Sequence, residues 1–383
     1  MQVLPIASGK GGVGKSLLAA NLSIAFAQAG KRVYLADLDL GGSNLHLILG
    51  LRGMYQGIGT FLSNPEVSFE QIVIETEYPN LSFIPGDGEI PGTANLRSSQ
   101  KRTLIRKLLS LDADYLVLDL GAGTNNNILD FFLSSGQGIV ITTPTPTALL
   151  NAYLFLKNSV FRIMYTTFRK DSRALEYLEG LRKEGSPFQR VYIPRLLATV
   201  RKEDPESYAS YIEAVEKFHP RVVLNMLEDP KDADTIHKLR RSCTQYLDLD
   251  IEHLGIIYRD DLQDIALGSR LPIISYKPQS VLSQAIYRIA DKLMHLESYG
   301  DAPLDLEYLD DSFQAADMEA EIDYEAKLQY LEELLHCGAL SSGDLIETIK
   351  TQQFEINRLK KENQLLKSKI AQYLSAVQGT ANG

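Results

Sequence analysis

The sequence is poor in cysteine and has no long apolar run. Only Cys243 and Cys337 occur in 383 residues, without a CxxC pair, which argues against a disulfide framework and a self-contained zinc or iron–sulfur site. No stretch of about eighteen apolar residues is present, so no transmembrane helix is expected. The first residues also lack the basic start and apolar stretch of a signal peptide. These absences predict a cytoplasmic protein.

Positive charge is also scarce. The sequence has 39 Lys and Arg residues against 49 Asp and Glu residues, a net charge of −10. This balance argues against a protein whose whole surface binds nucleic acid. Hydrophobic residues make up 44% and charged residues 23%, close to the averages of globular proteins. The length suggests two domains, or one large α/β domain with an appendage.

Short apolar runs alternate with helical patterns from residue 1 to 297. This alternation predicts an α/β domain with a mostly parallel sheet flanked by helices. Charged helical patterns near 161–219 are longer than a normal crossover and predict a helical insertion. The predicted strands are Val3–Ser8, Arg32–Asp37, Leu81–Ile84, Tyr115–Asp119, Gly138–Thr143, Val222–Asn225 and Leu254–Ile257.

The alternation of apolar runs and helical patterns ends at residue 297. Nine acids and no Lys or Arg lie between Tyr299 and Asp323, so 298–323 is expected to be a solvated linker. Residues 324–378 have a helical pattern, and 379–383 are expected to be a disordered tail.

A heptad pattern runs through the C-terminal helical region. Branched side chains at one seam position and a lone asparagine favour a parallel two-stranded coiled coil, which would join two copies of the chain. The alternative is an intrachain antiparallel hairpin with the preceding helix. The seam consists of Leu345, Ile349, Gln352, Ile356, Leu359, Asn363, Leu366, Ile370, Tyr373 and Val377.

A glycine-rich loop follows the first predicted strand. Residues 9–16 read GKGGVGKS, which satisfies GxxxxGK[ST] directly before a helical pattern. Such glycines let backbone N–H groups converge on phosphate oxygens, and the helix N-terminus adds positive potential. Lys15 is expected to reach the β and γ phosphates, and Ser16 to bind Mg²⁺. The predicted nucleotide-binding residues are Gly9, Gly11, Gly12, Val13, Gly14, Lys15 and Ser16.

The loop contains a second lysine, Lys10, and with it GKGGVGKS resembles the deviant Walker A motif of the MinD/ParA family of P-loop ATPases. The resemblance implies a SIMIBI-like P-loop fold over residues 1–297, with ATP and Mg²⁺ as ligands. It also implies that Lys10 contacts the nucleotide of a second copy in an ATP-dependent homodimer.

Two further segments extend the resemblance. Residues 36–44, ADLDLGGSN, resemble the family's switch I and would place Asp39 where it orients the attacking water. Asp119 ends an apolar run in the Walker B arrangement and would hold Mg²⁺ through water. The glycines at 121–123 resemble switch II. The implied catalytic residues are Lys10, Lys15 and Asp39, and the implied metal-binding residues are Ser16 and Asp119; the alternative for Asp37 and Asp39 is a turn or helix cap.

Residues 142–153, TTPTPTALLNAY, resemble the TPEPTxxxDAY stretch of the FlhG flagellar-number regulators, with Thr145 and Asn151 in place of its two acids. Farther on, Asn225 occupies the place where the family contacts adenine. The sequence has no NKxD motif for guanine, which favours ATP over GTP.

Together these features predict an ATPase switch that binds and slowly hydrolyses ATP, dimerises on ATP, and positions or regulates an assembly at the division site, flagellum or chromosome. A protein of that assembly is the expected partner. One alternative is a non-catalytic nucleotide-binding adaptor that acts through its coiled coil, and another is a metabolic P-loop enzyme such as an amide ligase.

The insertion contains a local basic excess. Ten basic residues and four acids lie between Arg162 and Lys202. One interpretation is a solvated helix face, and the other is a docking surface for DNA, anionic lipid or an acidic partner. The second would add a peripheral location at the cytoplasmic face of the membrane to the expected cytoplasmic one.

Overall fold

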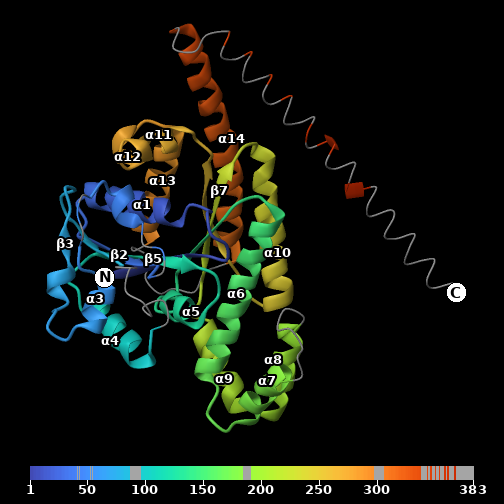
Figure 1. The fold of residues 1–383 in the computed structure, drawn as a ribbon. Coiled ribbons are helices and arrows are strands. Elements are labelled where there is room, and N and C mark those ends of the chain that lie inside the picture. Colours follow the sequence, from blue (N-terminus) through green and yellow to red (C-terminus); the bar gives the residue numbers. More distant parts are fainter. Residues whose placement is uncertain are drawn as a thin grey trace. The chain divides into compact units, whose positions relative to one another are not determined.

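An eight-stranded sheet organises the first of two structural units, residues 1–324 (Figure 1). The strand order is β3-β4-β2-β5-β1-β6-β7-β8, and each pair is parallel except β3 with β4. Because β1 lies between β5 and β6, the loop after it emerges at the middle of the carboxyl edge, where α/β sheets bind ligands. The strands are β1 (Gln2–Ser8), β2 (Val33–Leu38), β3 (Ile74–Glu75), β4 (Leu81–Ile84), β5 (Tyr115–Ala122), β6 (Ile139–Thr142), β7 (Arg221–Leu227) and β8 (Glu252–Tyr258).

The computed structural model describes residues 1–40, 42, 44–51, 53, 55–86, 96–183, 191–296 and 306–337, with isolated helical positions between 343 and 367. The expected α/β class and all seven predicted strands are confirmed. The sequence pattern misses β3, because two residues are too few to show an alternation. No described helix has both the length and the apolar character needed to cross a bilayer.

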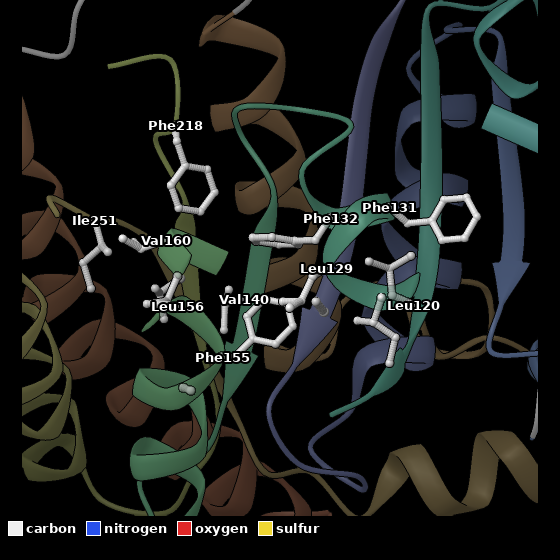
Figure 2. Packing of buried hydrophobic residues seen from close by; sticks show 14 of the residues in the cluster. Leu120, Leu129, Phe131, Phe132, Val140, Phe155, Leu156, Val160, Phe218 and Ile251 are labelled. Carbon is white, nitrogen blue, oxygen red and sulfur yellow. The ribbon is translucent and has the colours of Figure 1, made fainter. Parts of the chain in front are cut away.

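Helices pack on both faces of the sheet, over two separate cores. The core under α1 and α13 (Val281–Leu296) contains Phe26 stacked on Tyr115, with ring centroids 4.0 Å apart. The opposite core lies under α5, α6 and α10 (Asp234–Leu247); in it Phe132 meets Phe155 edge to face at 4.8 Å (Figure 2). The helices that precede the insertion are α1 (Lys15–Gln28), α2 (Leu45–Ile48), α3 (Ile58–Ser63), η1 (Glu70–Ile72), α4 (Ser98–Leu109), α5 (Asn126–Phe132) and α6 (Pro146–Thr167).

The described residues of the segment near 161–219 are mostly helical. It contains α7 (Arg173–Lys183), α8 (Ile193–Glu203) and α9 (Pro205–Val215) beside the far end of α6 (Figure 1). Part of its basic excess is already engaged within the chain. Arg162 pairs with Asp130, Arg169 pairs with Glu206, and Arg201 lies 5.7 Å from the Tyr208 ring centroid. These contacts reduce the positive charge available to an outside partner.

The helices that follow β7 complete the first unit. They are η3 (Pro230–Ala233), α10 (Asp234–Leu247), α11 (Leu262–Gly268), α12 (Ile273–Tyr276), α13 (Val281–Leu296) and α14 (Leu306–His336), of which α14 continues into the second unit.

The structure differs from the solvated linker expected over 298–323. Residues 306–323 form the first half of α14, and Leu309, Phe313, Ala316 and Ala320 are buried. Their spacing of four, three and four places them on one helix face. Four acids of α14 pair with basic side chains of α10 and α13: Asp317 with His237, Asp310 with Arg240, Asp323 with Arg288 and Glu319 with Lys292. The first unit therefore ends near Tyr324 and not at 297.

The predicted coiled coil falls in the second unit, residues 325–383. Leu366 is helical and 58% exposed. The other seam residues, from Leu345 to Val377, lie outside the described residues, as does the tail 379–383.

Candidate nucleotide-binding site

The loop between β1 and α1 has the backbone that its glycines predict. Gly12 and Gly14 adopt positive φ angles of 76° and 96°, a region that side chains with a Cβ rarely enter. Lys15 begins α1, is 8% exposed, and lies close enough to Asp119 for its charge to act on that carboxyl group. A helix N-terminus with a lysine beside it favours an anion.

Two elements distant in sequence press against this loop. A Cβ at Gly9 would lie 2.0 Å from the carbonyl oxygen of Asn151 in α6, so only glycine fits there. On the other side, Asn225 at the end of β7 donates from Nδ2 to the Val13 carbonyl at 2.8 Å. The structure therefore places Asn225 as a brace of the loop. Both neighbours fix the shape of the phosphate loop from outside it.

Two aspartates face each other at the ends of neighbouring strands. Asp37 of β2 and Asp119 of β5 are partners in register, and each is 1% exposed. The Asp37 carboxylate accepts the backbone N–H of Asp39 at 3.1 Å and that of Leu45 at 3.4 Å. Asp37 thus fixes the segment that follows β2, and Asp39 is left partly exposed beyond it.

Asp119 is a buried carboxyl group with a strongly raised pKa. Burial, together with the nearby charges of Asp37 and Asp39, raises the pKa of Asp119 to about 7. A hydrogen bond with the Ser16 hydroxyl and the charge of Lys15 act in the opposite direction. Asp119 Oδ1 is buried and has no hydrogen-bond partner among the described residues. The buried Asp119 carboxyl group therefore has one oxygen that is available to a ligand.

This arrangement fits a divalent cation. No group of three His, Cys, Asp or Glu side chains in the described part of the chain forms a protein-only metal cage. Mg²⁺ in nucleotide sites needs no such cage, because it takes few protein ligands and keeps waters and phosphate oxygens. The Ser16 hydroxyl and the Asp119 carboxylate are adjacent and are the groups that would hold it.

A cavity of about 120 Å³ lies beside Asp39. Asn125 and Asn127 line it together with Gly121, where a Cβ would lie 3.1 Å from Asp39 Oδ1. Asn125 also caps α5, because its Oδ1 accepts the backbone N–H of Ile128 at 3.0 Å. Neither asparagine is among the site residues predicted from the sequence, although three consecutive asparagines after a glycine-rich turn are a visible signal.

Lys10, the second lysine of the loop, lies on the surface. Its Nζ donates to the Thr147 hydroxyl at 3.4 Å, in the first turn of α6, and its carbonyl accepts from the Ser8 hydroxyl at 2.6 Å. Within one chain the exposed Lys10 ammonium therefore lies at the first turn of α6. The structure brings the other predicted residues together at the carboxyl edge of the sheet.

The comparison with protein families agrees with this geometry. The model of the ParA family described as a NUBPL iron-transfer P-loop NTPase matches residues 1–156. Residues 1–156 are therefore similar to the ParA family of P-loop NTPases. The resemblance to MinD/ParA proteins is thereby confirmed, and the match covers the glycine-rich loop, Asp39 and Asp119.

Individual relatives come from the same family. The chain is 34% identical over 149 residues to the septum site-determining protein MinD of Helicobacter pylori, covering 38% of this chain and 54% of that protein. It is 34% identical over 156 residues to the flagellum site-determining protein YlxH of the same organism, covering 40% of this chain and 52% of the relative. The chain thus spans about half the length of these curated relatives.

A solved structure extends the likeness in fold beyond residue 156. The septum site-determining protein MinD of Pyrococcus horikoshii OT3, complexed with Mg-ADP, superimposes with a TM-score of 0.52 at 20% identity. The match covers 79% of this chain and 99% of that one. The MinD-like P-loop fold is therefore confirmed for the sheet and its helices.

Proposed function

We propose that this chain is a switch ATPase that binds ATP with Mg²⁺, dimerises on ATP and hydrolyses it slowly. The observation that carries the proposal is the buried Asp119 carboxylate, which lies beside Ser16 and Lys15 with an unpartnered oxygen. A buried charge without a partner is costly, and a Mg²⁺ ion bound with ATP would remove that cost.

Each site residue would have its own role in phosphoryl transfer, a reaction that depends mainly on positioning and charge neutralisation. Lys15 and the loop amides would bind the β and γ phosphates. Asp39 borders a cavity large enough for a few waters and would orient the attacking one. Asn225 would act through the loop that it braces, and its contact with adenine stays a proposal.

A comparison of two aspartates tests this division. Asp39→Ala is expected to bind a fluorescent ATP analogue normally but to release phosphate at background rate. The control is Asp112→Ala. Asp112 precedes β5, its side chain is 86% exposed, and it pairs with Arg32 on the surface. Normal turnover of Asp39→Ala would remove Asp39 from the water-orienting role, and the same loss in Asp112→Ala would show that the assay does not report on the site.

The proposed homodimer depends on Lys10. Its ammonium is exposed, and Thr147 is its one hydrogen-bond partner among the described residues, so reaching the nucleotide of a second copy would break one surface hydrogen bond. We expect Lys10→Ala to bind ATP but to stay monomeric in a chain ending at Tyr324, which retains the whole first unit. Thr147→Ala is the control, because it removes the same hydrogen bond and leaves the lysine in place. Unchanged ATP-dependent dimerisation of Lys10→Ala in a sizing experiment would contradict this role.

The cellular role of the proposed switch is inferred from the names of its relatives. Two of them are named for determining the septum site and the flagellum site. We therefore propose that this chain positions or regulates a division or flagellar assembly from the cytoplasm. A tagged chain should concentrate at one cellular site, and Lys15→Ala should disperse it. A uniform distribution of both would leave the adaptor alternative as the better account.

A further inference from the structure

A groove lies on the face of the first unit formed by α6, α10 and the residues before α8. It has a volume of about 620 Å³ and mostly apolar walls, including Leu149, Tyr153 and Leu239. Three large side chains at its rim are unusually open to solvent: Leu150 is 58% exposed, Tyr192 46% and Tyr246 43%. Exposed apolar side chains that gather at one concave surface indicate a binding site.

The charge in the groove has one sign. The ionisable side chains among its described lining residues, apart from tyrosines, are Lys157 and Lys238, and none is Asp or Glu. Lys157 is 3% exposed; its Nζ donates to the Val191 carbonyl at 2.6 Å and lies 5.9 Å from the Tyr153 ring centroid. Lys238 is exposed on α10. The groove therefore favours an apolar ligand that carries negative charge.

On its other flank, α10 packs against the acidic helix α14. There His237 pairs with Asp317 of α14 at 3.0 Å, and Arg240 pairs with Asp310 at 2.5 Å. The Arg240 guanidinium also lies 4.6 Å from the ring centroid of Phe313, a buried residue of α14. One flank of α10 is thus covered by an acidic amphipathic helix. The groove flank has the same combination of basic and apolar side chains.

We propose that the groove between α6 and α10 binds an acidic amphipathic helix of a partner protein. Leucine-sized side chains of the partner would fill the space between Leu150 and Tyr246. Acidic side chains beside them would pair with Lys238 at the rim. This is helix-in-groove recognition, in which residues spaced by three and four anchor the ligand.

The start of α6 lines the groove and also contacts the phosphate loop. Leu149 and Leu150 of the groove directly precede Asn151, whose backbone oxygen leaves no room for a side chain at Gly9. Thr147, one turn earlier, holds Lys10. A helix bound against α6 would therefore also fix the α6 backbone that touches the loop. This coupling rests on the proposed ATPase function, whereas binding of the helix does not.

Binding is tested on the full chain without nucleotide, so that it succeeds or fails independently of ATP turnover. The probe is a fluorescein-labelled helical peptide with leucines on one face and glutamates beside them, measured by anisotropy. We expect Leu150→Asp to weaken binding about tenfold or more, because it places an unpaired charge in the groove. Lys238→Glu should also weaken binding and should shift the preference toward a peptide with lysines in place of the glutamates.

Two matched controls lie elsewhere on the first unit. Leu109→Asp alters a leucine that is 46% exposed on α4, and Lys202→Glu alters an exposed lysine of α8. Both should bind the acidic peptide as the unchanged protein does. Equal affinity for the acidic and basic peptides, or no difference between Leu150→Asp and Leu109→Asp, would overturn the proposal. It would also be overturned if phosphatidylglycerol vesicles, but neither peptide, bound through Leu150, because the ligand would then be a membrane.

The coupling to the loop is a second measurement. The acidic peptide should change the rate of phosphate release, and Leu150→Asp should abolish that change while it retains basal turnover. Peptide binding without any change in rate would remove the coupling and leave the docking site. Absence of basal turnover in the unchanged protein would count against the proposed ATPase, not against the groove.

Discussion

The phosphate site and the α14 contact both bury acidic side chains, but the two regions differ in how this charge is matched. At the β8 edge, Asp323 of α14 is 5% exposed and meets Arg288 at 2.6 Å, and Glu319 is 9% exposed and meets Lys292 at 2.6 Å. At the carboxyl edge of the sheet, Asp37 and Asp119 are each 1% exposed and face each other.

The difference follows from what each region does. A structural contact is stable when each buried charge has a partner, because an unpaired one costs several kcal/mol. A ligand site keeps charge that the ligand will neutralise, and a pKa of about 7 at Asp119 is the sign of this deficit. Removing a charge should therefore stabilise the empty phosphate site and destabilise the α14 contact.

The largest expected effect is at Lys15. Lys15→Ala should lower the affinity for ATP about a hundredfold or more, because charge-assisted hydrogen bonds to two phosphates are lost. Lys10→Ala is the matched control, since it removes an exposed lysine of the same loop that lies at the first turn of α6. Binding of a fluorescent ATP analogue measures both. Comparable losses in the two variants would contradict their different placement.

The next effect concerns α14. Arg288→Ala leaves Asp323 and Glu319 buried without their arginine and should lower the free energy of unfolding by about 3 kcal/mol. Arg259→Ala, which breaks a pair between side chains 62% and 70% exposed, should change it by less than about 1 kcal/mol. Urea unfolding followed by circular dichroism gives both values. Equal small losses would mean that α14 is only loosely attached to β8.

A buried histidine under α14 makes the contact sensitive to acid. His253 of β8 is 1% exposed, its ring centroid lies 5.3 Å from that of Phe313, and burial lowers its pKa to about 3. Because the unfolded chain takes up this proton near pH 6.5, stability is lost as the pH falls below that value. At pH 5 the loss from this group is about 2 kcal/mol.

His253→Phe should remove that part of the acid sensitivity. The difference between the unfolding free energies at pH 8 and pH 5 should shrink by about 2 kcal/mol. His295→Phe, at an exposed position of α13, should leave the difference unchanged. An unaltered difference in His253→Phe would show that the proton is taken up elsewhere.

The sequence predicts the phosphate site far better than the α14 contact, for a physical reason. GKGGVGKS, Asp39 and Asp119 are each tied to the end of a strand, and parallel strands bring such ends to one edge. The acids of α14 look solvated because their partners Arg240, Arg288 and Lys292 lie elsewhere in the chain. The spacing of four apolar residues does indicate a helix face, but the many acids around them obscure it. These residues are Leu309, Phe313, Ala316 and Ala320. Likewise, no local pattern shows that Asn151 touches Gly9 or that Lys157 is buried.

The central claim is that the buried charge of Asp119 is completed by Mg²⁺ bound with nucleotide. Its most direct test is the Mg²⁺-dependent gain in ATP affinity, measured by titration calorimetry from pH 5.5 to 8.5 on the unchanged chain and Asp119→Asn. Because Mg²⁺ must displace a proton whose pKa is about 7, the gain should fall about tenfold per pH unit below 7 and level off above it. In Asp119→Asn the gain should be small and independent of pH in this range. A pH-independent gain in the unchanged chain, or the same profile in both proteins, would contradict the account.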